Sequence, residues 1–335
     1  MADTASAVVD LKNVTVTYGK NPALADVTAA FPPGAVGLLG PNGAGKSTML
    51  RALLAFIVPR QGAMRVLGLD VADAALDIRR RVGYMPESDA HIPGMNAVSF
   101  VAYCGQLAGL PATDAMQRAH EVLYYVGLGE ARYRNLETYS TGMKQRIKLA
   151  QALVHDPGLL FLDEPTNGMD PKGRDEMLDL IRDLAHAKGV NLILSSHLLP
   201  DVESTCDHVV VLDKGRVVAQ GAIADLKRSL EHVVELEAVE ATAAPDGAQP
   251  VARPQARGRV FELHIKGNEA AFRDAVRTVG FDCRPADEQW HLVVPEGADL
   301  HQVFTIAARE RVQVRHLKPS VMTLEDVFAR AVGEE

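Results

Sequence analysis

Cysteine is scarce in this sequence. Three cysteines occur among 335 residues, and they lie far apart at Cys104, Cys206 and Cys283. This separation fits no metal-ligand spacing, which excludes a cysteine-bound metal cluster, and so few thiols are typical of a protein from a reducing compartment. We therefore expect all three to be small core residues.

Membrane spans, a targeting signal and an excess of positive charge are missing as well. No segment approaches the roughly 18 consecutive apolar residues of a membrane-spanning helix. Residues 1–12 lack the basic and apolar stretches of a signal peptide, so we expect none, and work at a membrane would require another chain. The formal net charge of −8 argues against a nucleic-acid partner.

A glycine-rich segment fits the phosphate-binding pattern G-x-x-x-x-G-K-[ST]. It lies between a strand predicted over 36–39 and a helix predicted over 46–56, whose free N–H groups would face an anion. The glycines let the backbone wrap around phosphates, Lys46 can reach the β- and γ-phosphates, and Ser47 can place its hydroxyl on Mg²⁺. The expected nucleotide-binding residues are Gly40, Pro41, Asn42, Gly43, Ala44, Gly45, Lys46, Ser47 and Thr48. The alternative is a glycine-rich turn that matches by chance.

Two acids close an apolar run over residues 159–164. Such a run predicts a strand buried on both faces, and ligands bind at the carboxyl ends of strands in open α/β sheets. Asp163 would complete a Mg²⁺ shell opposite Ser47, and Glu164 could orient or deprotonate an attacking water. The alternative is a helix-capping pair before Pro165.

A second apolar strand, predicted over 191–196, leads to His197 at the same end of the sheet. A single histidine is more often structural than catalytic, but an imidazole here could bond a γ-phosphate and position a water. Tyr18 ends a further strand predicted over 7–18, before a loop around Pro22, where its ring could stack on a base or simply pack.

A helical region is predicted over roughly 96–155. Asn96 is expected to cap its first helix and Thr113 its second. A third helix follows Ser140 and Gly142 and runs to the break at 156–158, so its start is a second anion-binding end.

These motifs together resemble the nucleotide-binding subunit of an ATP-binding cassette (ABC) transporter. The resemblance extends from Tyr18 to His197 and is highly specific because the motifs occur in one order. The residues that carry it are Tyr18, 40–48, Glu87, Ser140-Thr141-Gly142-Met143, 159–164, Asn167-Gly168-Met169-Asp170 and His197.

The resemblance implies a P-loop NTPase fold, with a RecA-like parallel sheet core and antiparallel β and helical subdomains. It implies ATP and Mg²⁺ as ligands, with Tyr18 against adenine, Glu164 as catalytic base and His197 as switch histidine. The signature and the D-loop would contact ATP from the opposite subunit through Ser140, Gly142, Met143 and Asp170. Two subunits, as a homodimer or a pseudo-symmetric heterodimer, would work with an integral-membrane permease on the inner face of the cell membrane.

Two motifs depart from the commonest pattern of the family. The signature has Tyr139-Ser140-Thr141-Gly142-Met143 in place of LSGGQ, which keeps the serine and the second glycine. Glu87 replaces the usual glutamine, and we expect its carboxylate to ligate Mg²⁺ beside Ser47 and Asp163. Both variants resemble the branch of the family that exports drugs, sodium or lipids, so export is expected.

The chain is long enough for two domains. We expect an ATPase domain over 1–230, which includes a hairpin over 207–218, and an α+β, ferredoxin-like domain over 231–335. In the second domain we expect a strand over 232–239, a mobile loop over 241–258 and a last helix over 324–332. The second domain could limit dimer separation or sense a small molecule. A permease could dock on 84–105, where Met85, Ile92, Met95 and Phe100 would line a groove unless they are core residues.

Two other functions remain open from the sequence. One is a non-transport ABC-type ATPase that acts as a mechanical or regulatory switch, although such relatives usually carry two cassettes or a long coiled coil. The other is a generic P-loop switch or kinase, which leaves the signature and His197 without a role.

Overall fold

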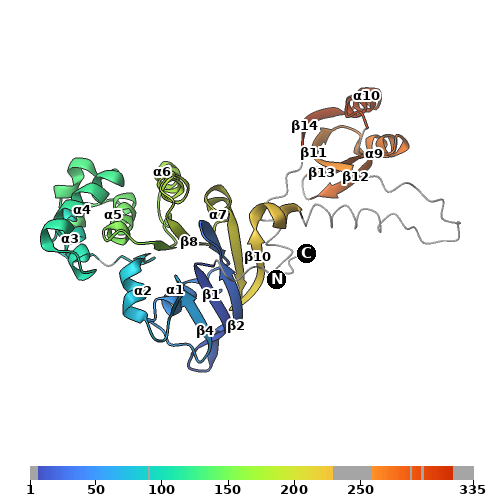
Figure 1. Ribbon diagram of the computed structural model, residues 1–335. Helices are drawn as coiled ribbons and strands as arrows, with labels where there is room; N and C mark the ends of the chain where they lie inside the picture. Colours follow the sequence, from blue (N-terminus) through green and yellow to red (C-terminus); the bar gives the residue numbers. More distant parts are fainter. Residues whose placement is uncertain (1–6, 90, 229–257, 287–288, 296–297, 320–335) are drawn as a thin grey trace. The chain divides into compact units, whose positions relative to one another are not determined.

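The protein is represented by a computed structural model that describes residues 7–89, 91–228, 258–286, 289–295 and 298–319 (Figure 1). The chain divides into two compact units, with a boundary between Leu226 and Lys227. Every helix in the described ranges is too short or too polar to cross a lipid bilayer.

A six-stranded, mostly parallel sheet forms the centre of the first unit. Its strand order is β10-β9-β3-β8-β7-β6, and only β10 runs antiparallel to its neighbour. The central strands are β3 (Ala35–Leu39), β8 (Asn191–Ser196) and β7 (Leu159–Asp163), which are buried because their sequences are almost continuously apolar. The outer strands are β6 (Val82–Met85), β9 (His208–Asp213) and β10 (Arg216–Ala222). This sheet confirms the predicted α/β P-loop core.

An antiparallel sheet shares a hydrophobic core with the central strands. Its order is β2-β1-β4-β5, formed by β1 (Val9–Tyr18), β2 (Asn21–Phe31), β4 (Gln61–Val66) and β5 (Leu69–Asp70). The predicted loop around Pro22 is wrong, since this residue belongs to β2. A proline is tolerated there because β2 is an edge strand and Pro22 lies near its start.

The predicted helical region contains α3 (Ala97–Leu107), α4 (Ala112–Tyr125) and α5 (Thr141–Leu153), with short 3₁₀ helices at Gly129–Tyr133 and Leu136–Thr138. Asn96 caps α3 as predicted, because its side chain accepts from the N–H of Ser99. The predicted cap at Thr113 is wrong. Helix α4 begins directly after Pro111, and the Thr113 hydroxyl donates to Asp114 Oδ1 at 3.2 Å instead.

The remaining helices of the first unit lie before, between or after its strands. Helix α1 (Lys46–Leu53) ends before the predicted Phe56, because the backbone turns left-handed at Ala55 with φ 57°. The predicted hairpin over 207–218 is confirmed by β9 and β10. Other helices are α2 (Ala75–Arg81), α6 (Pro171–Arg182), the π-helix η3 (Asp183–Ala187), α7 (Leu199–Thr205) and a helix over 223–228.

The described residues of the second unit form a four-stranded antiparallel sheet with two helices. Its elements are β11 (Gly258–Lys266), α9 (Glu269–Thr278), β12 (Asp282–Ala286), β13 (Gln289–Pro295), α10 (His301–Arg309) and β14 (Gln313–Pro319). The strand order β12-β13-β11-β14 and this β-α-β-β-α-β sequence confirm the ferredoxin-like prediction. Phe272 and Leu263 are fully buried in its core. The dimerisation and sensor roles of this unit stay predictions.

Three predicted segments fall wholly or almost wholly outside the described residues. They are the strand over 232–239, the mobile loop over 241–258 and the helix over 324–332. Those predictions therefore stay as they are.

The cysteines lie in or near the cores. Cys206 and Cys283 are buried, and Cys104 on α3 is half-buried. Burial raises the pKa of Cys104 and of Cys283 to about 11. The expectation of small core residues is confirmed for Cys206 and Cys283.

A close contact between α5 and β6 allows a test of the packing. A Cβ added at Gly83 would lie 2.1 Å from the carbonyl oxygen of Ala152. We expect Gly83→Ala to lower the free energy of unfolding by about 1–3 kcal/mol, measured by urea denaturation. Gly158→Ala is the control, because no described atom outside its chain neighbours would lie within 4 Å of that Cβ. Equal losses in the two variants would contradict the close contact.

Candidate active site

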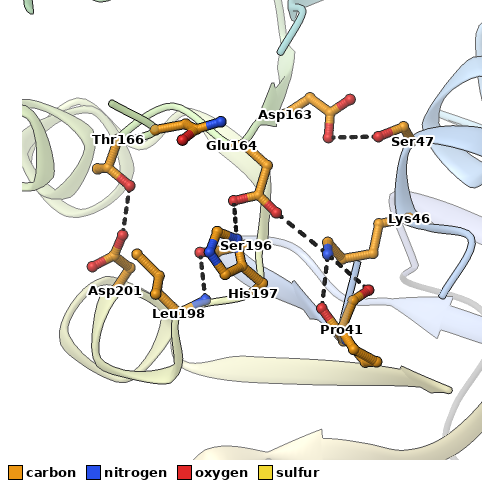
Figure 2. A network of polar contacts seen from close by, with 12 residues as sticks. Pro41, Lys46, Ser47, Asp163, Glu164, Thr166, Ser196, His197, Leu198 and Asp201 are labelled. Carbon is orange, nitrogen blue, oxygen red and sulfur yellow. Dashed lines mark hydrogen bonds and ion pairs between the residues drawn. The ribbon is translucent and has the colours of Figure 1, made fainter. Parts of the chain in front are cut away.

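The carboxyl ends of three adjacent strands meet at one edge of the parallel sheet. The glycine-rich loop follows β3, Asp163 ends β7 with Glu164 directly after it, and His197 follows β8. Because β8 lies between β3 and β7, residues far apart in sequence become neighbours here. Figure 2 shows Lys46, Glu164 and His197 joined by polar contacts, with the contact between Ser47 and Asp163 beside them.

The loop between β3 and α1 takes a path that requires glycine. Gly40, Gly43 and Gly45 have φ values of 159°, 84° and 108°. An added Cβ would lie 2.3 Å from Leu212 O at Gly40 and 2.6 Å from Ala23 O at Gly45. Such a loop, which leads directly into a helix start, forms a backbone cradle suited to phosphate.

Lys46 is the buried cation of the site. Its Nζ donates to the carbonyl oxygens of Gly40 at 2.7 Å and Pro41 at 3.3 Å. The same nitrogen lies 3.3 Å from Glu164 Oε1, and the two side chains are 5% and 7% exposed. A cation so far from water requires anionic or carbonyl partners, and phosphate oxygens could serve as well.

Glu164 is held between Lys46 and His197. Its Oε2 lies 2.8 Å from Nδ1 of His197 (Figure 2). The backbone of Glu164 is left-handed, with φ 50°, and its N–H donates to Ser195 O at 3.0 Å. A left-handed non-glycine residue is strained, and such strain concentrates at functional sites. The strained turn aims this carboxylate at the loop.

Asp163 and Ser47 form a second contact across the same edge. Ser47 Oγ donates to Asp163 Oδ1 at 3.1 Å. Asp163 is fully buried, and its Oδ2 has no hydrogen-bond partner among the described residues. Burial and then the charge of Asp163 raise the pKa of Tyr84 on β6. A buried carboxylate oxygen without a partner beside a hydroxyl is a donor set that suits Mg²⁺.

A cavity lies over the loop. It is lined by Ala23, Pro41, Asn42, Gly43, Gly45, Lys46, Ser47, Thr48, Glu87 and Glu164. Glu87 follows β6 in an exposed position, so its carboxylate shares the cavity with Ser47. Tyr18, at the end of β1, is 53% exposed.

The residues expected to act across a dimer lie on a different part of the surface from this cavity. Ser140 caps α5, and its Oγ accepts from the N–H of Met143 at 3.4 Å. Asp170 occupies the exposed N-cap position of α6. Neither these residues nor Gly142 is among the described residues that line the cavity.

A supporting network around residues 164–170 was not predicted. Asp201 on α7 is buried, and its carboxylate accepts from Thr166 Oγ1 at 2.6 Å and from Arg174 Nε at 2.7 Å. Gln145 on α5 donates to Asn167 O at 2.8 Å. The sequence signal that could have indicated this network is Asp201, an acid shortly after His197 in the helix that follows β8. These hydrogen bonds hold the segment that follows Asp163 and Glu164 in place.

Comparison with known proteins agrees with this geometry. Residues 24–167 match the family described as "ABC transporter". The daunorubicin/doxorubicin resistance ATP-binding protein of Streptomyces peucetius is 37% identical over 66% of this chain and 67% of its own length. A Nod factor export ATP-binding protein of Cupriavidus metallidurans is 32% identical over 78% of this chain and 87% of its own.

A solved structure supports the fold comparison. A dimeric ATP-binding cassette in a post-hydrolysis state, bound to ADP and Pi, has a TM-score of 0.59 and 25% identity. It matches 64% of this chain and 98% of its own. Some curated relatives are matched only in part, since this chain spans 63% of the length of one that is 42% identical.

Loss of the buried cation provides a direct test of the site. We expect Lys46→Ala to weaken ATP binding and to lower turnover at least about 100-fold, because phosphate charge loses its main cationic partner. Nucleotide titration and phosphate release would measure the two effects. Lys12→Ala is the control, since Lys12 is 61% exposed on β1. Normal turnover by Lys46→Ala would contradict the assignment.

Proposed function

Because this chain belongs to the ABC transporter family, we propose that it is the subunit that binds and hydrolyses ATP to drive export through a separate membrane permease. The proposed catalytic activity of the chain is therefore ATP hydrolysis, in agreement with the similar cassette described in a post-hydrolysis state. The observation that carries the proposal is the group of Lys46, Glu164 and His197, in which the buried Glu164 carboxylate contacts the buried Lys46 ammonium and the partly exposed His197 ring. A phosphate-binding cation and an imidazole that both contact one carboxylate provide what phosphoryl transfer to water requires.

In the proposed mechanism the loop over 40–48 binds the phosphates through its backbone N–H groups, and the Lys46 ammonium binds the β- and γ-phosphates. Tyr18 stacks on the adenine. Glu164 Oε1, which lies 3.3 Å from the Lys46 ammonium, accepts the proton of the attacking water once that ammonium binds phosphate. His197 holds Glu164 Oε2 and so fixes the direction of the carboxylate.

We propose that Ser47, Asp163 and Glu87 hold Mg²⁺. Ser47 and Asp163 already share a bond of 3.1 Å, and the unpartnered Oδ2 of Asp163 is a further ligand oxygen. Glu87 lines the same cavity from the end of β6. Bound Mg²⁺ would neutralise the charge that develops on the β- and γ-phosphate oxygens.

We propose that two subunits bind head to tail and enclose two ATP molecules. Ser140, Gly142 and Met143 would approach the γ-phosphate of the opposite subunit through the N-terminus of α5, with Asp170 beside them. The exposed positions of Ser140 and Asp170 support this assignment, because one chain does not bring them to its own cavity. The dimeric cassette found among solved structures supports it as well.

The permease partner and the direction of transport are also proposals. Export is supported by the drug-resistance and Nod factor export proteins among the relatives. Met85 and Phe100 are buried, so they are core residues rather than groove residues, whereas Ile92 is 38% exposed. We propose that the surface around Ile92 contacts the permease, which would place the chain on the inner face of the membrane.

Glu164→Gln separates ATP binding from ATP hydrolysis. An amide cannot accept the water's proton, so we expect unchanged ATP affinity, at least about 100-fold slower turnover and a dimer that persists with Mg-ATP. Phosphate release and size-exclusion chromatography would measure these. Glu130→Gln, at an 88% exposed glutamate, is the control. Normal turnover would show that another group is the base, and a strictly monomeric variant would refute the shared sites.

Glu87→Gln tests the proposed metal ligand. An amide binds Mg²⁺ more weakly than a carboxylate, so the Mg²⁺ concentration for half-maximal ATPase activity should rise about two- to tenfold. Glu121→Gln, on the exposed face of α4, is the matched control. Identical Mg²⁺ titrations for the parent and Glu87→Gln would remove the ligand role.

A further inference from the structure

Lys148 is a buried cation that the proposed mechanism does not use. It lies on α5, the helix that begins at Ser140, and its side chain is only 1% exposed. Burial lowers the pKa of its ammonium group, while the charges of Asp89, Glu87 and Asp163 act in the opposite direction. A buried ammonium carries three donors, and each requires an acceptor.

Among the described residues, the acceptors of Lys148 come from the short segment that carries Glu87. Its Nζ donates to the carbonyl oxygen of Pro86 at 3.0 Å and to that of Glu87 at 2.7 Å. The same nitrogen lies 3.7 Å from Asp89 Oδ1. The main chain of residues 86–89 therefore cannot leave α5 without exposing an unpaired charge in the core.

This contact joins two parts of the site. The carbonyl held by Lys148 belongs to Glu87, whose side chain lines the nucleotide cavity. The N-terminus of α5 is capped by the exposed Ser140, which is proposed to contact the ATP of the opposite subunit. One side chain thus links the metal-side carboxylate to the helix that binds in trans.

We propose that Lys148 is a positioning residue for ATP hydrolysis, which holds the main chain of Glu87 on α5 so that the carboxylate and the helix N-terminus keep one relative position. The inference rests on the proposed function, because it assigns no separate reaction. It predicts that the loss of Lys148 affects the Mg²⁺-dependent step through Glu87 rather than through general stability.

The test compares Lys148→Met with Lys144→Met in the full chain. Methionine fills a similar volume without donors. Lys144 lies earlier on α5 and also pairs with Asp89, at 3.5 Å, but in the described part of the chain the carbonyls of Pro86 and Glu87 accept from Lys148 instead. For Lys148→Met we expect about tenfold lower kcat, little change in KM for ATP, and a severalfold higher half-activating Mg²⁺ concentration. Lys144→Met should resemble the parent, and Lys148→Arg, which retains donors, should recover part of the activity.

Hydrogen exchange provides a readout that does not depend on activity. The amides of residues 87–89 should exchange about tenfold faster in Lys148→Met than in Lys144→Met. A double-mutant cycle with Glu87→Ala tests the route of the effect. If Lys148 acts through Glu87, then Lys148→Met should shift the Mg²⁺ titration in the parent but not in the Glu87→Ala background.

Three results would overturn the inference. Lys148→Met could lower thermal stability while kcat and the Mg²⁺ titration stay at parent values, which would leave Lys148 a merely structural residue. Equal shifts in the parent and Glu87→Ala backgrounds would show that Lys148 acts elsewhere. A parent chain without Mg²⁺-dependent ATPase activity would overturn the proposed function and the inference with it.

Discussion

The ammonium group of Lys46 lies almost completely out of contact with water, 3.3 Å from the carboxylate of Glu164. A buried charge is tolerated only when it is paired, so this contact keeps the glycine-rich loop and the end of β7 together. His197 holds the other oxygen of the same carboxylate at 2.8 Å, which includes the end of β8 in the arrangement. An anion that attracts Lys46 must therefore change what Glu164 contacts, so anion binding in the loop is coupled to the position of this carboxylate.

The support for this ion pair extends outward through hydrogen bonds to the main chain. Thr166 and Arg174 share the buried carboxylate of Asp201, which fixes the segment between β7 and α6. Gln145 binds the carbonyl of Asn167 from α5. Because α5 contributes to this support and also begins at Ser140, a displacement of that helix would be transmitted to the carboxyl end of β7 through these hydrogen bonds.

Sequence patterns predicted the elements that depend only on residues close to one another in the sequence. The apolar runs of β3, β7 and β8, the glycine loop and the Asn96 cap follow from side-chain type and spacing alone. The patterns failed where tertiary context decides: Pro22 belongs to a strand because that strand is at an edge. They also missed Asp201 and Lys148, because a charged residue on a helix is ordinarily solvated, and only the folded chain shows that both are buried.

The cysteines have a practical consequence for spectroscopy. Cys206 and Cys283 are shielded by core side chains, and Cys104, half-buried on α3, keeps its proton well above neutral pH because of burial. Maleimide reagents attack the exposed thiolate, so the native thiols should react slowly. A cysteine engineered on the surface of either unit could then be labelled selectively in an otherwise natural background. A pair of fluorophores placed in this way could follow the separation of the two units over a catalytic cycle.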